Sequence, residues 1–417
     1  KDELILYMGL IILGLIFIST VISVITTFLL ALFSAKTGAE ISDRLLKYYL
    51  EKDILYHDSK NTSIITKNLS TESLRMTDLV INPFMQMNAK IVLSIFILIF
   101  IFLINPIVAT VGITSFLLTY LLIYQIVKGR LDTNGRHLTE VIANRFLLIN
   151  ESFGGVKETI LLNKSSFYYS KYKKLGKLYS KTRGINHGIS LAPRYLVEFI
   201  SYGGIILSVI IFIIFYPNKL GEFVSLLTIY AIASLKLLPA LQQIYTSVTQ
   251  IRGNITSFLG LKEDLMSANK GINLVKKFEI KSFEDLKFVN VSFTYPNKDL
   301  PAIKDLSLEI FRNKNIAFVG SSGSGKSTLI NLILGLLQPC EGKIDINNTG
   351  IGFDLIKNRD SLVGYVPQDI YLTDKSIIEN IAFGIDKSSI DLIKIKNAIR
   401  LAKLEEFINS FENGLYT

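Results

Sequence analysis

The stretch Gly320-Ser-Ser-Gly-Ser-Gly-Lys-Ser-Thr328 decides the fold of the C-terminal third of this chain. An apolar run, Ile316–Val319, precedes it, and a second apolar run, Leu329–Leu337, follows it. A strand, a glycine-rich turn and a helix in this order are the setting in which G-x-x-x-x-G-K-[ST] indicates a phosphate-binding loop. The alternative is an ordinary glycine- and serine-rich turn, against which the flanking strand and helix argue.

The residue types of this loop suit phosphate binding. Its three glycines allow backbone torsions closed to other residues, so successive N–H groups can point at phosphate oxygens. The helix expected from Lys326 adds the positive end of its dipole. Lys326 is predicted to reach the β- and γ-phosphates as a catalytic residue, and the Ser327 hydroxyl to hold Mg²⁺. The predicted cofactor-binding residues of the loop are Gly320, Ser321, Ser322, Gly323, Ser324, Gly325, Lys326, Ser327 and Thr328.

Composition narrows the class of protein. The chain has 417 residues, enough for two or three domains, and 49% of them are hydrophobic, which is too many for a soluble protein. Its single cysteine, Cys340, excludes an internal disulfide and a cysteine-based metal cluster. Three scattered histidines supply no zinc site. A net charge of +10 could suggest a nucleic-acid partner, so the placement of the charges matters.

Five apolar segments are predicted to cross a membrane as helices, because a span requires about 20 residues. The first run exceeds this length, and the second is too long for a single span. Asn105-Pro106 is expected to break the second long run into a tight hairpin, and Pro217-Asn218 to turn the chain after the fourth span. Lys236 lies within the last span. The segments are Leu4–Phe33, the two halves of Ile91–Val127, Tyr195–Phe215 and Phe223–Ile251.

Basic residues are concentrated in two of the connections, 34–90 and 128–194. The positive-inside rule makes these two loops cytoplasmic, so the basic excess reports topology and no nucleic-acid partner is predicted. An odd number of spans then places Lys1 outside, and a further helix before it is expected. The start without methionine suggests a fragment of a longer protein.

Both cytoplasmic loops show helical periodicity, over Ala35–Tyr56 and Leu138–Lys181. Turn-forming residues interrupt the first at His57–Ser63 and the second at Phe153-Gly154-Gly155. Short elements at these tips could dock on a partner domain. The alternative is a solvated helical hairpin.

The chain is therefore divided into a transmembrane domain (1–251), a polar linker (252–285) and the first part of a nucleotide-binding domain (286–417). The predicted fold class is an α-helical transmembrane domain followed by a partial α/β P-loop domain. The strands expected in the last segment are Leu286–Phe293, Ile303–Ile310, Ile316–Val319, Lys343–Ile346 and Leu362–Val366. The helices expected there are Lys326–Leu337, Ile377–Ala382 and Ile390–Ile408.

This organisation resembles a half-transporter of the ATP-binding cassette exporters of the type IV fold. The segment Val291-Ser-Phe-Thr-Tyr295-Pro resembles the A-loop of that family, and Val363-Gly-Tyr-Val-Pro-Gln368-Asp resembles its Q-loop. The resemblance implies ATP and Mg²⁺ as cofactors, with Tyr295 stacked on adenine and Gln368 coordinating Mg²⁺ or positioning water. The alternatives are a core tyrosine and a surface glutamine. The resemblance also implies that the two cytoplasmic tips are coupling helices.

In the family, the signature sequence, a catalytic glutamate and a switch histidine would follow Thr417. The chain as given is therefore expected not to turn over ATP, whereas the intact protein is expected to be an ATPase. The resemblance implies a second copy of the chain as partner, because each ATP lies between the loop of one copy and the signature of the other.

Two segments bear on the cargo. Ala192-Pro-Arg194-Tyr-Leu-Val-Glu198 and Asn150–Glu158 resemble bacterial lipid-linked oligosaccharide flippases. The resemblance implies a lipid or lipid-linked glycan as substrate and the bacterial inner membrane as location. Ionisable residues at membrane depth usually line a cavity, so Arg194, Glu198 and Lys236 are the candidate substrate residues. Arg194 and Glu198 could instead pair, and Lys236 could extend to the interface. The other candidate functions are a peptide or drug exporter and a nucleotide sensor that hydrolyses nothing.

Overall fold

The computed structural model describes residues 2–104, 106–215, 220–269, 278–296, 298–350, 352, 362–368 and 370–417. The chain forms two compact units, Lys1–Leu274 and Val275–Thr417. The two predicted turns at Asn105 and at Pro217-Asn218 involve residues outside the described ranges. The sequence-based domain limits at 251 and 285 stay predictions.

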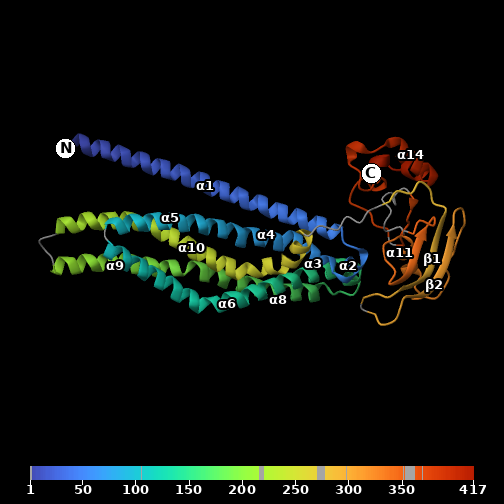
Figure 1. Cartoon of the computed structure of the whole chain (residues 1–417), viewed down its shortest axis with the longest axis horizontal. Coiled ribbons are helices and arrows are strands. Elements are labelled where there is room, and N and C mark those ends of the chain that lie inside the picture. The colour runs from blue at the N-terminus through green and yellow to red at the C-terminus, as the bar shows by residue number, and fades with distance from the viewer. Residues whose placement is uncertain are drawn as a thin grey trace. The chain divides into compact units, whose positions relative to one another are not determined.

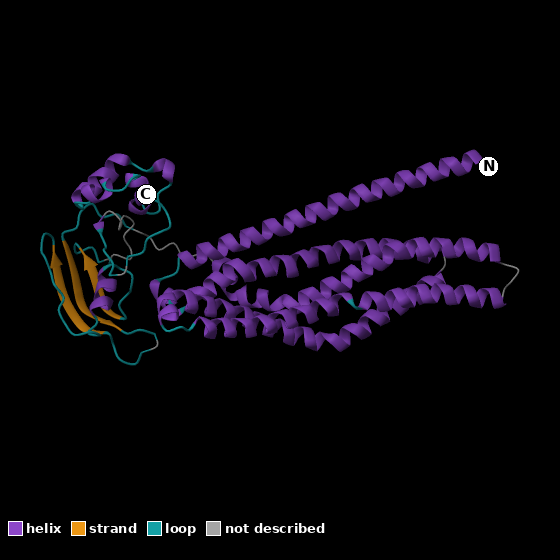
Figure 2. Ribbon diagram, turned by 180° about the vertical axis from the view of Figure 1, so that it is seen from behind, coloured by secondary structure: helices purple, strands orange, loops and turns teal. Residues whose placement is uncertain are grey.

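The described residues of the first unit are helical (Figures 1 and 2). Short helical segments join the long helices. These segments are α2 (Ile54–Ser59), α3 (Thr62–Lys67), the π-helical turn η1 (Asn68–Glu72), α4 (Ser73–Met76), the π-helical turn η2 (Thr77–Ile81) and α7 (Val156–Leu161). The long helices are α1 (Asp2–Leu50), α5 (Asn82–Ile104), α6 (Pro106–Gly154), α8 (Ser165–Leu191), α9 (Pro193–Phe215) and α10 (Leu220–Asn269).

Among the described residues, three helical stretches are long and apolar enough to cross a membrane, by length and composition. They are Gly9–Leu50, Thr62–Ile104 and Gly112–Gly154, and they overlap the first three predicted spans. On α1, Leu13 and Phe17 are 66% and 67% exposed, as expected of side chains that face lipid rather than a protein core. Parts of α9 and α10 fall outside the residues whose side chains are described, so the last two spans stay predictions.

The two long connections contain the predicted helical extensions. Helix α1 continues without a break to Leu50, and α2 begins after Asp53, whose side chain accepts from the Tyr56 N–H at 2.9 Å. Such a cap satisfies one of the N–H groups left free at a helix start. The second extension is interrupted at Gly154-Gly155, where α6 ends and α7 follows. At the first tip, Ser63 is buried and its Oγ accepts from Asn150 Nδ2, which connects α3 to α6.

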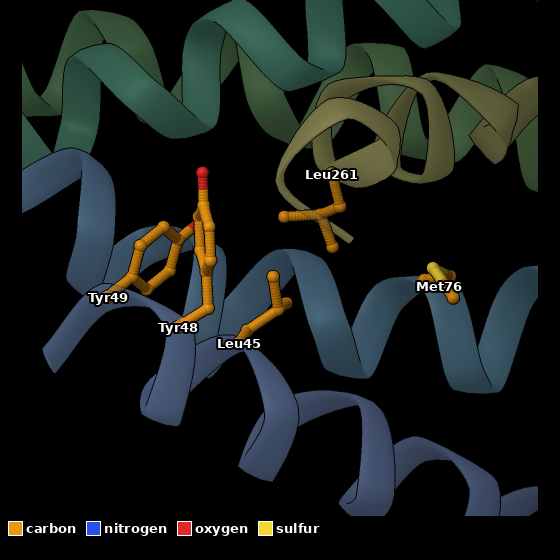
Figure 3. Close-up of a cluster of buried hydrophobic side chains, with 5 residues drawn as sticks. All are labelled: Leu45, Tyr48, Tyr49, Met76 and Leu261. Carbon is orange, nitrogen blue, oxygen red and sulfur yellow. The ribbon is translucent and has the colours of Figure 1, made fainter. Parts of the chain in front are cut away.

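A cluster of buried side chains packs α1, α4 and α10 together (Figure 3). Leu45, Tyr48 and Tyr49 come from α1, Met76 from α4 and Leu261 from α10. The Tyr49 hydroxyl donates to Asp264 Oδ2 at 2.7 Å and accepts from Asn68 Nδ2 at 3.2 Å. The cluster therefore links helices that are about 200 residues apart in the sequence, and the buried Tyr49 hydroxyl has both a donor and an acceptor partner.

The buried tyrosines at this cluster should make the folded protein less stable at alkaline pH. Burial, followed by the hydrogen bond to Asp264, raises the pKa of Tyr49 far above its ordinary value, and burial also raises that of Tyr56 to about 12. A folded pKa above the unfolded value of about 10 gives stability that is complete below pH ~10 and is lost as the pH rises towards the folded pKa. We expect the melting temperature to fall between about pH 10 and 12. The fall should be smaller in Tyr49→Phe and unchanged in Tyr169→Phe, whose ring is exposed. Equal falls in both variants would contradict this assignment.

A buried polar network lies beside this cluster. Glu72 is 2% exposed; its carboxylate lies 3.7 Å from Lys67 Nζ and 3.4 Å from Arg75 Nη1. Arg75 donates from Nε to Asn254 Oδ1 and from Nη1 to Thr139 Oγ1, each at 2.9 Å. Burial lowers the pKa of Arg75, and the charge of Glu72 opposes that shift. The network thus connects η1 and α4 to α6 and α10 through groups that are costly to leave unpaired.

The second unit contains a three-stranded antiparallel sheet in the order β2-β1-β3 (Figure 2). Leu286 of the central strand pairs with Ile310 on one side and with Ile346 on the other. The strands are β1 (Asp285–Phe293), β2 (Ile303–Phe311) and β3 (Glu341–Ile346). The helices are α11 (Lys326–Ile333), α13 (Ile377–Ile381), α14 (Leu392–Leu401) and α15 (Glu405–Asn409). Three of the five predicted strands are confirmed.

The strands predicted at Ile316–Val319 and Leu362–Val366 are wrong, because both segments are irregular in the described chain. Val319 and Val366 are 94% and 86% exposed. Short apolar strands of this kind form when neighbouring strands supply ladder hydrogen bonds and helices cover both faces. Among the described residues, neither segment has a strand beside it.

Two predicted helices are shorter than expected. The helix from Lys326 ends at Ile333, because Gly335 takes φ +65° and the Leu336 N–H bonds back to Asn331 O at 2.9 Å. The helix predicted over Ile390–Ile408 is divided into α14 and α15 at Lys403, whose φ is +54°.

Candidate nucleotide-binding site

The loop Gly320–Gly325 leads directly into α11 and depends on glycine at its last position. Gly325 precedes the helix with φ +87°, and Gly323 has φ +81°. A Cβ on Gly325 would lie 2.5 Å from the carbonyl oxygen of Ala302, which belongs to the backbone before β2. The start of α11 therefore lies closer to the backbone before β2 than any residue with a side chain at position 325 would allow.

Gly325→Ala is expected to weaken nucleotide binding at least tenfold, because the loop must move away from Ala302 to admit a methyl group. Gly350→Ala is the matched control: Gly350 has φ +77°, but nothing lies within 4 Å of the place that a methyl group would take there. Titration of both variants with a fluorescent ATP analogue measures the difference. Equal affinities would show that the close approach does not matter for binding.

The charges and donors of the loop fit a triphosphate. Lys326 Nζ donates to Gly320 O at 2.9 Å and to Ser321 O at 2.7 Å, so the ammonium group lies within the loop. Gly325 gives α11 no side-chain cap, and the first N–H groups of a helix have no acceptor inside it. The loop contains no carboxylate, and the Ser327 side chain that follows Lys326 is exposed. Backbone N–H groups, a lysine and a hydroxyl in this order are a donor set for ATP with Mg²⁺.

The structure brings Tyr295 to this loop. Tyr295 follows β1, and its hydroxyl lies 3.2 Å from Oγ1 of Thr328 in α11. Its ring meets that of Phe293 edge to face, with the centroids 5.0 Å apart. The aromatic side chain is thus held beside the helix that begins the phosphate site, where a base attached to the phosphates could stack on it.

Tyr295→Ala is expected to raise the dissociation constant for ATP roughly 5- to 150-fold, because a base–aromatic contact contributes about 1–3 kcal/mol. Tyr295→Phe keeps the ring and removes only the hydroxyl bonded to Thr328, so its affinity should stay within a few-fold of wild type. Isothermal titration with ATP and with inorganic triphosphate measures both. An alanine variant that binds ATP as the wild type does would reject stacking.

The predicted role of Gln368 is not tested by its contacts. It lies in an exposed bend, and none of the hydrogen bonds found among the described residues connects it to residues 320–328. The strand expected before it, Leu362–Val366, is not formed in the described chain. Its predicted role toward Mg²⁺ stays a prediction.

Cys340 supports the site and Asn380 fixes the segment before α13, and the sequence singled out neither residue for these contacts. The thiol of Cys340 lies against the backbone of Thr294, with the Thr294 N–H at 3.5 Å and the Thr294 carbonyl at 3.7 Å, and so holds the residue before Tyr295. Asn380 accepts from the N–H and the hydroxyl of Thr373 and donates to Lys375 O at 2.9 Å. A lone cysteine and an asparagine on a short helix carry no sequence signal for such contacts.

Of the three candidate substrate residues, Arg194 and Glu198 lie together, whereas Lys236 does not line their cavity. Arg194 Nε donates to Glu198 Oε1 at 2.6 Å, so these two pair across one turn of α9, and both line a cavity of about 300 Å³. Lys236 is exposed on α10 and does not line this cavity.

Comparisons with known proteins agree with this architecture. The ATP-dependent lipid A-core flippase of Wigglesworthia glossinidia brevipalpis is 28% identical over 226 residues, which cover 53% of this chain and 38% of that protein. The lactococcin-G-processing and transport ATP-binding protein of Lactococcus lactis is 40% identical over 144 residues, 34% of this chain and 19% of that protein. The chain thus spans well under half the length of these relatives.

A bacterial Atm1-family ABC exporter, solved with ATP bound, shares the fold with a TM-score of 0.71 at 16% identity over 92% of this chain and 67% of that one. Two family models match the chain: "ABC transporter transmembrane region" over residues 1–234 and "ABC transporter" over residues 303–414. The first alone covers more than half of the 417 residues. The chain is therefore a multi-pass membrane protein that belongs to the ABC transporter family.

Proposed function

We propose that the protein flips a lipid-linked oligosaccharide or a related lipid across a bacterial inner membrane, driven by ATP and working as a homodimer. The observation that carries the proposal is the loop Gly320–Thr328, with Lys326 held inside it and Tyr295 beside it, in the same chain as a helical membrane unit. The named activity of the Wigglesworthia relative, lipid A-core flipping, supports a lipid cargo.

In this proposal, the loop and Tyr295 hold ATP, and Ser327 and Gln368 hold Mg²⁺. When bound, ATP supplies the free energy of hydrolysis. Lys326 Nζ would exchange the Gly320 and Ser321 carbonyls for phosphate oxygens, which leaves its charge paired with an anion instead of two dipoles. The Tyr295 ring would stack on the base and set its orientation.

The proposal assigns residues 1–251 to the transmembrane domain, 252–285 to the linker and 286–417 to the nucleotide-binding domain. The short helices α2 and α7 lie where the cytoplasmic extensions turn back, and we assign them the role of coupling helices. A second copy of the chain would complete each ATP site, and closure of two such sites would move the helices between inward- and outward-facing states.

The second candidate is a peptide exporter of the same fold. The Lactococcus relative favours it, because its name states lactococcin-G processing and transport and it is 40% identical over its matched residues. Those residues make up only 34% of this chain, too little to decide the cargo of the helical unit.

Stimulation of ATP hydrolysis separates the two candidates. The protein would be reconstituted in vesicles and given a polyprenyl glycolipid without phosphate groups, a hydrophobic peptide or a cationic dye. We expect the glycolipid alone to raise the hydrolysis rate severalfold. Stimulation by the peptide and not by the glycolipid would support the second candidate and reject the first.

A further inference from the structure

Two cavities adjoin inside the helical unit and differ in chemistry. The first, of about 430 Å³, lies between α5, α6 and α10 and is lined almost entirely by apolar side chains, such as Leu98, Phe116 and Leu241. The second, of about 300 Å³, lies between α6, α9 and α10 and is lined by Tyr202, Gln242 and Gln243 together with the pair Arg194–Glu198. Tyr120 lines both.

The polar cavity carries no net charge over its described lining. Among the described lining residues, only Arg194 and Glu198 are charged, and they neutralise each other at 2.6 Å. Lys236, the cation that the sequence placed nearby, is outside the lining. The remaining polar groups are phenols, a serine hydroxyl and two amides, which recognise hydroxyl groups by donating and accepting hydrogen bonds. The described lining therefore offers a charged group no unpaired counter-charge.

Tyr120 joins the two cavities. Its hydroxyl donates to Gln242 Oε1 at 3.3 Å on the polar side, and its ring lies 5.2 Å from the ring of Tyr245, which lines the apolar cavity. Gln242 is held in turn by Thr246 Oγ1 at 3.1 Å. A single side chain thus forms the wall between an apolar space and a neutral polar one, and one molecule could occupy both sides of it.

We infer that these cavities form a bipartite site for an amphiphile, with its aliphatic chain in the apolar cavity and an uncharged, hydroxyl-bearing group in the polar cavity. The inference rests on the proposed function and specifies the substrate class. It replaces recognition of a phosphate by Arg194 and Lys236 with recognition of sugar-like hydroxyls by amides and phenols.

The chain contains no tryptophan, so a single introduced one reports on the site. Phe116→Trp places the reporter in the apolar cavity, and Leu98→Trp on α5 is a second reporter should the first variant fail to fold. The full chain in lipid nanodiscs would be titrated with dodecyl maltoside whose chain carries two bromines, which quench tryptophan on contact. Dodecyl sulfate and dodecanol with the same brominated chain test the head group.

We expect saturable quenching by the maltoside at a concentration in the membrane at least tenfold below that required for the sulfate or the alcohol. Tyr202→Phe removes one hydroxyl from the polar cavity and should raise the half-saturating maltoside concentration about three- to tenfold without changing that of dodecanol. Tyr195→Phe, on the same helix but outside both linings, should change neither.

Equal quenching by all three head groups would mean an adventitious additive only and would overturn the inference, as would a preference for the sulfate. The titration uses no ATP. Glycolipid-stimulated hydrolysis without head-group selectivity would therefore reject the bipartite site and keep the proposed function. Selective binding without any ATP-driven transport would reject the proposed function alone.

Discussion

In the intact protein, Lys326→Ala is expected to abolish ATP hydrolysis and to weaken ATP binding at least tenfold, while insertion into the membrane is unchanged. The ammonium group of Lys326 lies inside the loop and donates hydrogen bonds to two backbone carbonyls and to Ser324. Its removal therefore takes no contact away from the hydrophobic core. The variant loses the charge-assisted hydrogen bond from the ammonium group to the phosphate oxygens, and such a bond contributes about 1.5–3 kcal/mol to binding.

Lys396→Ala is the matched control, because it removes an exposed lysine from α14 of the same unit. Phosphate release by the purified protein in lipid measures hydrolysis, and labelling by a photoreactive ATP analogue measures binding. Normal turnover in Lys326→Ala would show that Gly320–Thr328 is not the phosphate site. A loss in Lys396→Ala as well would point to charge, not position, as the cause.

Glu72→Gln is expected to destabilise the helical unit by about 3–5 kcal/mol, because it leaves two buried cations without their anion. Glu72 is the acidic partner of both Lys67 and Arg75, and the side chains of all three are at most 10% exposed. The change keeps size and shape, so the effect reports on charge and not on packing. A thermal unfolding curve in detergent should show a clear decrease in melting temperature.

Glu40→Gln provides the control for this second prediction. Glu40 pairs with Arg44 at 3.8 Å on the surface of α1, where both side chains are more than half exposed. Exposed pairs contribute about 0–1 kcal/mol, so this variant should unfold almost as the wild type does. Similar melting temperatures for Glu72→Gln and the wild type would mean that the network is not a source of stability.

The sequence was most informative where structure depends on local pattern. Hydropathy and length located the helices that contain Leu4–Phe33 and Ile91–Val127, because an uncharged helix of this length needs no information from distant residues. The conformation of the phosphate loop could also be anticipated, because glycine readily adopts the positive φ found at Gly323 and Gly325.

Contacts between distant segments could not be predicted in this way. Arg75 meets Asn254 across 179 residues, and Tyr49 meets Asp264 across 215, and neither pair carries a periodic signal. The strands expected at Ile316–Val319 and Leu362–Val366 failed for the related reason that a buried strand depends on its neighbours. The pairing of Arg194 with Glu198 could be anticipated from their spacing of four, whereas the exclusion of Lys236 from their cavity depends on how α9 and α10 pack.

The central claim is that ATP bound at Gly320–Thr328 drives movement of a lipid through the helical unit. The most direct measurement is translocation of a fluorescent polyprenyl glycolipid without phosphate groups in vesicles, scored by whether an added reagent can still quench it from outside. We predict that ATP changes the accessible fraction with the wild type and leaves it unchanged with Lys326→Ala. Translocation that is independent of ATP, or equal in the two proteins, would contradict this account.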